Sequence, residues 1–413
     1  MGEEPARARQ RGGFRQDPPD HQLRPDPDQS RREQHPGEPM TIKRGVSLYS
    51  YQQTQFFKEL DLEGQIREVG TNLGGADGIE IVDEMSLHYP DPGAEFTREW
   101  FSWMEQYGTK PVAMDVGMDV LQFRDHVMSY DECADRLIHD ITLAKSLGFN
   151  IVRTLSVVPI EVIEKALPHA EKLDVKLGKE LHQPMVLEGP QAREILDLAE
   201  RTGSEHVGLV PDLGIFQFRP SDVQLDWYKR KGAQQSACDA VVDLSLELRD
   251  GKAPFGHIDM SRHTAGNLRA DFGRFIRTRE TSPEFTDAFN GVIAVTNDRV
   301  ENPTDLDYTV VSEALMLSHT STDTLRELTG RITHIHGKFN NMSEIPGRPG
   351  QYQDISIDYA PVVQALKDGG YDGYIDTEYE GQRYFQDRGV EDLENEVEQV
   401  RRHQEMLARL IAS

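Results

Sequence analysis

Residues 175–184 read Val-Lys-Leu-Gly-Lys-Glu-Leu-His-Gln-Pro and place a carboxylate and an imidazole two positions apart, at Glu180 and His182. In a β-strand, residues two apart project to the same face, so both side chains can address one cavity. A carboxylate ligand beside a base is the combination that metal-assisted proton abstraction requires. We therefore treat this segment as the centre of a candidate active site.

The rest of the chain alternates strand-like apolar runs with helical patterns, which is typical of a parallel sheet built from βα units. Eight such runs occur, at residues 45–49, 78–82, 111–116, 151–155, 175–181, 207–210, 332–336 and 374–377. Helical spacing marks intervening segments such as 131–147 and 190–202. The pattern predicts an α/β fold, a (β/α)8 TIM barrel with its chemistry at the carboxyl ends of the strands. A doubly wound open sheet is the rival, but no Gly-x-Gly-x-x-Gly follows the first strand.

Two segments depart from the repeating pattern. Residues 215–330 are far too long for one βα connection, and their helical periodicity predicts an ordered helical insertion between strands six and seven of the barrel domain, residues 40–413. It either covers the pocket or forms a subunit interface. Residues 1–39 are rich in Arg, Pro, Asp and Gln and predict a disordered tail, unless the start codon has been assigned too early.

Polar residues stand at the ends of four successive predicted strands. They are Glu180, Asp212, His336 and Glu378. Three carboxylates and one imidazole suit a hard or borderline divalent ion, with Mn²⁺ preferred and Mg²⁺ or Co²⁺ as alternatives. Burying so much negative charge without a cation is very costly. Period-two spacing leaves His334 as an alternative to His336, and Glu380 as an alternative to Glu378.

Further candidates lie near the same strand ends. Lys338 is a candidate catalytic electrophile, or else a charge at the barrel rim. The predicted substrate-binding residues are His88, Glu84, Arg153, Tyr49 and Glu380. Tyr49 could stack on a sugar or an aromatic ring, although core packing is the commoner role of such residues.

These strand ends resemble those of the xylose isomerase-like superfamily of sugar isomerases and epimerases, over nearly everything after Met40. In that superfamily the seventh-strand ligand is the second His of a His-x-His pair, which maps onto His336, and the eighth-strand ligand maps onto Glu378. The segments at 45–52, 78–86, 179–182 and 378–381 resemble more closely the alpha (large) subunit of bacterial C-glycoside deglycosidases. Residues 1–39 have no expected counterpart there.

The resemblance implies a metal-dependent lyase, paired with a small all-β subunit in a hetero-oligomer, that releases the aglycone from a 3-keto-C-glycoside. The keto group acidifies the hydrogen at C2, and C1 is then placed for β-elimination. The metal would stabilise the enolate and His182 would remove the proton, since histidine ordinarily titrates near pH 6.5. Alternatively, His182 supports a metal ligand. A sugar isomerase or epimerase acting on another keto-sugar is the second function, and a catalytically silent partner subunit is the third.

Composition limits the remaining choices. The 413 residues include 45 Lys and Arg against 71 Asp and Glu, and the net charge of −26 argues against binding nucleic acid or anionic membranes. No apolar run approaches the roughly 18 residues of a membrane-spanning helix. The two cysteines, Cys133 and Cys238, are far apart and fit reduced thiols in a cytoplasmic protein.

Overall fold

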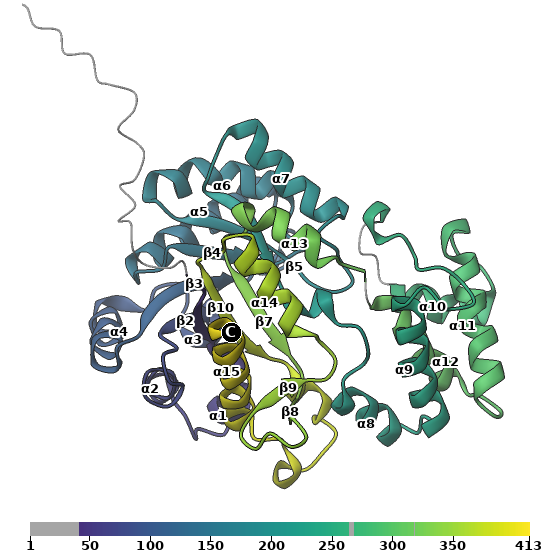
Figure 1. Cartoon of the computed structure of the whole chain (residues 1–413). Helices are drawn as coiled ribbons and strands as arrows, with labels where there is room; N and C mark the ends of the chain where they lie inside the picture. The colour runs from purple at the N-terminus through teal and green to yellow at the C-terminus, as the bar shows by residue number, and fades with distance from the viewer. Residues whose placement is uncertain (1–40, 264–267, 318) are drawn as a thin grey trace, which may run out of the picture. The chain divides into compact units, whose positions relative to one another are not determined.

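Eight parallel strands form a nearly closed barrel in the computed structural model, which describes residues 41–263, 268–317 and 319–413 (Figure 1). The strand order is β6-β5-β4-β3-β2-β1-β10-β7, and isolated parallel bridges from Leu209 to Ile332 and from Asp212 to His336 bring β7 beside β6. The barrel strands are β1 (Lys43–Ser47), β2 (Gly78–Val82), β3 (Lys110–Val116), β4 (Ile151–Thr154), β5 (Lys176–Leu181), β6 (Val207–Pro211), β7 (Ile335–Phe339) and β10 (Tyr374–Tyr379). The predicted (β/α)8 fold is therefore confirmed, whereas the predicted tail at 1–39 lies outside the described residues.

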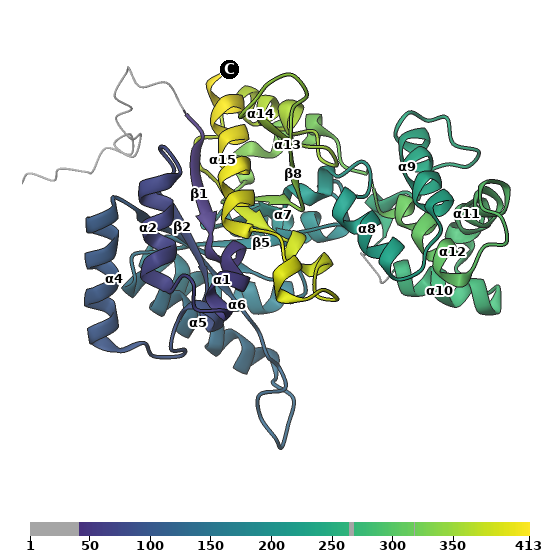
Figure 2. The ribbon, with the colours of Figure 1, turned by 90° about the horizontal axis from the view of Figure 1, so that it is seen from below.

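Helices surround the strands (Figures 1 and 2). They are α1 (Gln52–Phe56), α2 (Leu62–Asn72), α3 (Asp83–Ser86), α4 (Gly93–Tyr107), α5 (Tyr130–Ser146), α6 (Ile160–Leu173), α7 (Pro190–Thr202), α13 (Thr322–Leu328), α14 (Tyr359–Asp368) and α15 (Glu396–Ala412). A short antiparallel pair, β8 (Met342–Glu344) with β9 (Tyr352–Asp354), follows β7 and was not predicted.

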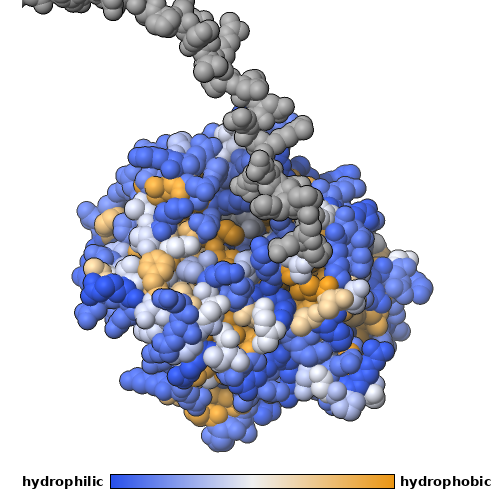
Figure 3. Space-filling model, turned by 60° about the vertical axis from the view of Figure 1, so that its left-hand side comes forward, coloured by the Kyte–Doolittle hydropathy of each residue, from blue (hydrophilic) through white to orange (hydrophobic). Residues whose placement is uncertain are grey.

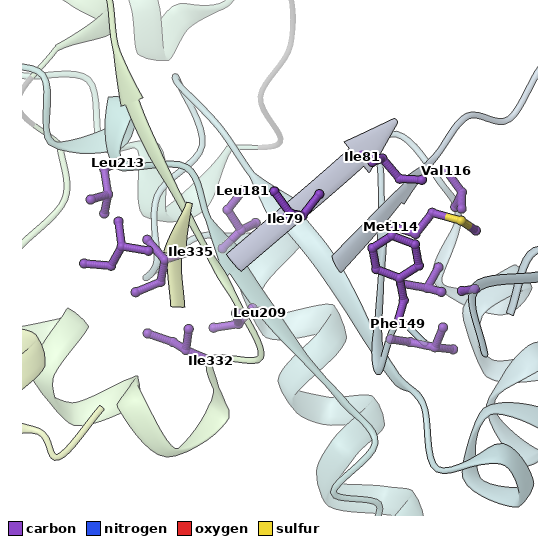
Figure 4. Close-up of a cluster of buried hydrophobic side chains, with 14 of the residues drawn as sticks. Ile79, Ile81, Met114, Val116, Phe149, Leu181, Leu209, Leu213, Ile332 and Ile335 are labelled. Atoms are coloured by element: carbon purple, nitrogen blue, oxygen red, sulfur yellow. The ribbon is translucent and has the colours of Figure 1, made fainter. Parts of the chain in front are cut away.

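The two faces of each barrel strand carry different residues. In β2, Ile79 and Ile81 belong to the main hydrophobic core, and Glu80 between them is fully buried on the opposite face. Met114 and Val116 likewise flank Asp115 in β3, and Figure 4 shows these apolar side chains gathered in the core. The apolar face thus packs under the helices, and the opposite face fills the barrel interior with charged residues.

The predicted insertion is helical. Its helices are α8 (Asp222–Arg230), α9 (Gln235–Arg249), α10 (Leu268–Thr278), α11 (Thr286–Arg299) and α12 (Asp305–Ser312), and they enclose a second hydrophobic core. Helices α8 and α9 are separated by a turn at Gly232, whose φ of 102° an L side chain rarely adopts. The assignment of residues 40–413, insertion included, to one domain stays a prediction.

The C-terminal helix supplies a test of pH-dependent stability. His403 in α15 is fully buried, stacks on Phe339 with ring centroids 4.4 Å apart, and shares a 2.9 Å hydrogen bond with Thr377. Burial lowers its pKa from 6.5 to about 3, so the fold favours neutral imidazole. This contribution to stability is complete above pH 6.5 and is lost as the pH falls toward 3, by up to about 1.4 kcal/mol per unit.

We expect His403→Gln to flatten the fall in unfolding free energy between pH 6.5 and 4, measured by urea denaturation at several pH values. The matched control is His88→Gln, because His88 is exposed. An unchanged slope in His403→Gln would contradict the assignment.

No helix among the described residues is long and apolar enough to cross a membrane. The face of the molecule in Figure 3 is mostly hydrophilic, with hydrophobic residues in small separate groups. Cys133 and Cys238 are both free and buried. A location in the cytoplasm stays a prediction.

Candidate active site

Three of the four predicted metal ligands meet inside the barrel. Nδ1 of His336 lies 3.2 Å from Oε1 of Glu180 and 3.6 Å from Oε2 of Glu378. One ligand atom from each residue lies within 4.8 Å of the others, and all three side chains are buried. The strands β5, β7 and β10 therefore bring together residues that are as much as 198 positions apart (378 − 180).

A second set of buried groups lies behind His336. Nε2 of His336 is 3.1 Å from Oε2 of Glu80, and the same oxygen is 2.7 Å from Nε2 of His334. Asp376 lies on the other side, with Oδ2 at 3.4 Å from His334 Nε2. Gly45 in β1 makes room, since a Cβ there would lie 2.0 Å from Asp376 Oδ1. When Nε2–H of His336 donates to Glu80, Nδ1 presents its lone pair to Glu180 and Glu378.

This geometry separates the residues that the sequence left as alternatives. His334 pairs with Glu80 and Asp376, whereas His336 faces Glu180 and Glu378. Burial lowers the pKa of His334, but the opposing effect of the Asp376 and Glu80 carboxylates is larger and raises the pKa to about 9. His334 is thus a buried cation between two carboxylates, while His336 is the imidazole that faces the other two.

Arg153 is a buried cationic neighbour of Glu180, in addition to the imidazole of His336. Its Nη2 lies 2.9 Å from Oδ2 of Asp115 and 3.6 Å from Oε1 of Glu180. Arg153 and Asp115 are register partners on β4 and β3, so the strand pairing sets their contact. The predicted substrate-binding role of Arg153 stays a prediction. The residue is 6% exposed, and its buried Nε donates no hydrogen bond to a described residue.

The donor set fits a divalent cation. Five carboxylates, those of Glu80, Asp115, Glu180, Asp376 and Glu378, are buried in the barrel interior. Burial raises the pKa of Glu378 to about 7, although His336 and Lys338 oppose the shift. Oε2 of Glu378 is buried and accepts no hydrogen bond from the described residues. An oxygen ligand of this kind beside a histidine nitrogen suits Mn²⁺, Mg²⁺ or Co²⁺.

A cavity of about 240 Å³ begins beside this cluster. Its wall includes His182, Asp212, Lys338, Glu380, Arg383 and Tyr384. Lys338 on β7 is the register partner of Glu378 on β10. Because Lys338 lines the cavity, the cavity adjoins the buried carboxylates.

Lys338 joins two of the predicted site residues. Its Nζ lies 3.0 Å from Oδ2 of Asp212 and 2.5 Å from Oε2 of Glu380. Burial lowers the pKa of Lys338, but Asp212 and Glu380 raise it well above its ordinary value, so the amine is a cation. Asp212 also accepts a 2.7 Å hydrogen bond from the Gly214 amide. It belongs to neither set of three converging ligand residues among the described residues, which are Glu180, His336 and Glu378, and Glu80, His334 and His336.

Lys338 pairs with Oε2 of Glu380, and two other residues contact the second carboxylate oxygen, Oε1. Arg383 pairs with its Oε1, and the Tyr49 hydroxyl donates to the same oxygen at 3.4 Å. Tyr49 therefore supports a carboxylate in the cavity wall, in contrast to a residue packed only in the core.

His182 lies in the cavity wall, and its two ring nitrogens are engaged differently. Nδ1 is 2.9 Å from the carbonyl oxygen of Gln183, which only accepts, so Nδ1 carries the hydrogen. Nε2 is 2.9 Å from Oγ of Ser156 and accepts its hydroxyl hydrogen. In the neutral imidazole the lone pair is therefore on Nε2. A substrate that gives its proton to Nε2 must displace the Ser156 hydroxyl.

The structure does not bring Glu84 and His88 into this cavity. Glu84 is 55% exposed and pairs with Arg136 at 3.3 Å, and His88 is exposed. Among the described residues that line the cavity, neither is present. Both follow β2 in a segment that turns into α3 and leaves the barrel axis.

Sequence reasoning missed several residues of the site. Glu80 and Asp376 had one available signal, an acidic residue inside an apolar strand that should be buried. Arg383 had a local signal, its i,i+3 spacing from Glu380, whereas Ser156 had none, because it reaches His182 only through the path of the loop after β4.

Glu80 supplies a prediction about metal binding. Glu80→Gln removes the charge that orients His336, and we expect the affinity for Mn²⁺ to fall by about 10- to 100-fold, measured by titration with electron paramagnetic resonance. The matched control is Asp77→Asn, whose carboxylate pairs with Lys110 just before β2. Equal affinities in the two variants would show that Glu80 does not position the ligand.

Known proteins were compared with the chain. No protein-family model matches it. A 3'-dehydrocarminate deglycosidase alpha subunit from a Microbacterium species is 27% identical over 342 residues, which cover 82% of this chain and 88% of that protein. A C-glycoside deglycosidase alpha subunit from Microbacterium trichothecenolyticum is 26% identical over 343 residues, covering 82% and 83%. The chain resembles the alpha subunits of C-glycoside deglycosidases. The resemblance inferred from the sequence is confirmed at this level of identity.

Solved structures also match over most of the chain. A sugar phosphate isomerase/epimerase from Parabacteroides distasonis is 11% identical with a TM-score of 0.46, covering 90% of this chain and 94% of that one. An L-ribulose 3-epimerase is 12% identical with the same TM-score, covering 90% and 95%.

Proposed function

We propose that the chain is the catalytic subunit of a divalent-metal-dependent lyase that cleaves the C–C glycosidic bond of 3-keto-C-glycosides. The observation that carries the proposal is the convergence of Glu180, His336 and Glu378 beside a cavity that also holds His182. The names of the curated relatives, deglycosidases of dehydrocarminate and of C-glycosides, supply the substrate class.

Glu180, His336 and Glu378 would hold the ion, with Asp212 as the fourth ligand. Mn²⁺ is the preferred ion, with Mg²⁺ or Co²⁺ as alternatives. When bound, it supplies a Lewis acid for the keto oxygen of the sugar. Glu80 keeps His336 in the orientation that this set needs.

His182 removes the proton from C2. Its Nε2 carries the lone pair, and Nδ1–H stays on the Gln183 carbonyl, so the ring is oriented throughout. The electron pair of the C2–H bond becomes the C1–C2 double bond, and the bond from C1 to the aglycone breaks. The ring carbon of the aglycone takes up a proton, which the protonated His182 can return. Proton loss and proton gain balance, so the reaction needs no oxidant, reductant or water.

Lys338 contributes a fixed positive charge. Its position between Asp212 and Glu380 keeps the amine protonated and 16% exposed at the cavity wall. There it can donate to a sugar oxygen, and Glu380 and Tyr49 complete a polar wall suited to sugar hydroxyls.

A partner subunit completes the proposal, since the curated relatives are named alpha subunits. A small all-β fold for that partner is what the family resemblance implies. The test is to incubate the Mn²⁺-loaded chain with a 3-keto-C-glycoside, with and without such a partner, and separately with a panel of free ketoses. We expect release of free aglycone and no conversion of the ketoses. Conversion of a ketose without aglycone release would make the chain a sugar isomerase or epimerase.

A further inference from the structure

A helix of the insertion contributes a residue to the active-site cavity. Arg269, the second residue of α10, lines the cavity together with Arg383 and Tyr384. Leu268, Phe272 and Phe275 of the same helix are buried in the core of the insertion. The packing of α10 therefore sets the position of Arg269, and the insertion supplies part of the cavity wall.

The guanidinium of Arg269 is held in a fixed plane. Its Nε and Nη2 donate to the two carboxylate oxygens of Glu313 at 2.7 and 2.8 Å. Glu313 is itself buried and accepts hydrogen bonds from Tyr228 at 3.1 Å and Gln224 at 3.3 Å. A bidentate pair of this kind fixes both the direction and the plane of the guanidinium.

Part of this guanidinium is open to a ligand. The side chain of Arg269 is 48% exposed, although its partner is buried. Nε and Nη2 make the hydrogen bonds to Glu313, and Nη1 donates none to any residue that the structure describes.

Arg269 pairs with Glu313, which is not one of the buried carboxylates of the barrel interior. The charged groups that act on it are Glu313, Tyr228 and Tyr384, whereas Asp212, Glu380 and Glu378 act on Lys338. Arg269 and Lys338 thus line the same cavity but pair with different carboxylates, Glu313 for Arg269 and Asp212 and Glu380 for Lys338. A substrate whose sugar lies beside Lys338 and His182 would present its aglycone to the part of the wall that the insertion supplies.

We propose that Arg269 recognises the anionic oxygens of a carboxylate on the aglycone. The inference rests on the proposed function, and it makes Arg269 a specificity-determining residue that does not touch the reacting carbons. A preorganised arginine fork favours such oxygens over uncharged ones, because hydrogen bonds to a charged acceptor are the stronger ones.

The test compares two substrates that differ in one charge, the 3-keto-C-glycoside of a hydroxybenzoic acid and its methyl ester. In Arg269→Gln we expect KM for the acid to rise about 10- to 100-fold with kcat unchanged, and KM for the ester to stay the same. The matched control is Arg262→Gln, which removes a positive charge from an 80% exposed side chain of the insertion. It should alter neither substrate.

A double variant, Arg269→Gln with Glu313→Gln, leaves no unpaired buried carboxylate and keeps the test valid if the single variant folds poorly. The same loss for the acid is expected. Calorimetric binding of the unoxidised glycoside acid, which cannot eliminate, measures recognition apart from turnover. Weaker binding in both Arg269 variants supports the inference even if no turnover occurs, in which case only the proposed lyase activity fails. Equal effects on acid and ester, or no effect on binding, would overturn it.

Discussion

Glu378→Gln is expected to weaken Mn²⁺ binding by at least about 100-fold and to lower kcat by about 1,000-fold or more. The substitution keeps the shape of the side chain and removes the charge that the ion needs. Because burial already raises the pKa of Glu378 to about 7, the metal-free variant should be at least as stable as the wild type. Metal content by mass spectrometry and thermal unfolding with and without Mn²⁺ measure the two effects separately.

The matched control for Glu378→Gln is Glu84→Gln, which removes an exposed carboxylate paired with Arg136. It should keep both metal content and turnover. A Glu378→Gln variant that binds Mn²⁺ as tightly as the wild type would remove this residue from the ligand set, and an unfolded variant would show that its charge is structural.

His182→Gln has the second large effect. We expect turnover to fall by about 100- to 10,000-fold while the affinity for Mn²⁺ is unchanged, because glutamine cannot take the C2 proton and His182 is not among the converging ligand atoms. Ser156→Ala serves as the comparison, since it removes only the hydroxyl bound to Nε2. It should retain most of the activity.

The result that would contradict this role is a parallel loss of metal and turnover in His182→Gln. His182 would then be a ligand or the support of one. Rescue of His182→Gln by added imidazole, with its rate rising as imidazole is deprotonated, would support proton transfer at that position.

Period-two spacing predicted which residues of a strand share a face, but not which of them belong to the site. It placed Glu180 and His182 on one side of the fifth strand, and the structure finds Glu180 in the buried cluster and His182 in the adjoining cavity wall. It could not choose between His334 and His336, because both lie on the same face. Their different partners decide that, and Glu80 lies 254 residues from His334 in the sequence. A pattern of neighbouring residues cannot predict a contact between residues so far apart in the sequence.

Strand boundaries and the insertion were harder still. The seventh strand was expected at 332–336, but β7 is Ile335–Phe339, because the chain first closes a short 3-10 turn at Thr329–Arg331. Lys338 consequently lies within the strand, which explains its close pairing with Asp212 and Glu380. Arg269 could not be found from sequence at all, since its place in the cavity depends on how α10 packs in the insertion core.

The most direct test of the lyase proposal follows the hydrogen at C2. A 3-keto-C-glycoside carrying deuterium at C2 is incubated with the Mn²⁺-loaded chain and its partner subunit, and both products are analysed by mass spectrometry and NMR. We expect free aglycone, a keto-sugar with a C1–C2 double bond that has lost the label, and neither product from His182→Gln. Release of aglycone together with a sugar that keeps its C2 deuterium would contradict the proposal.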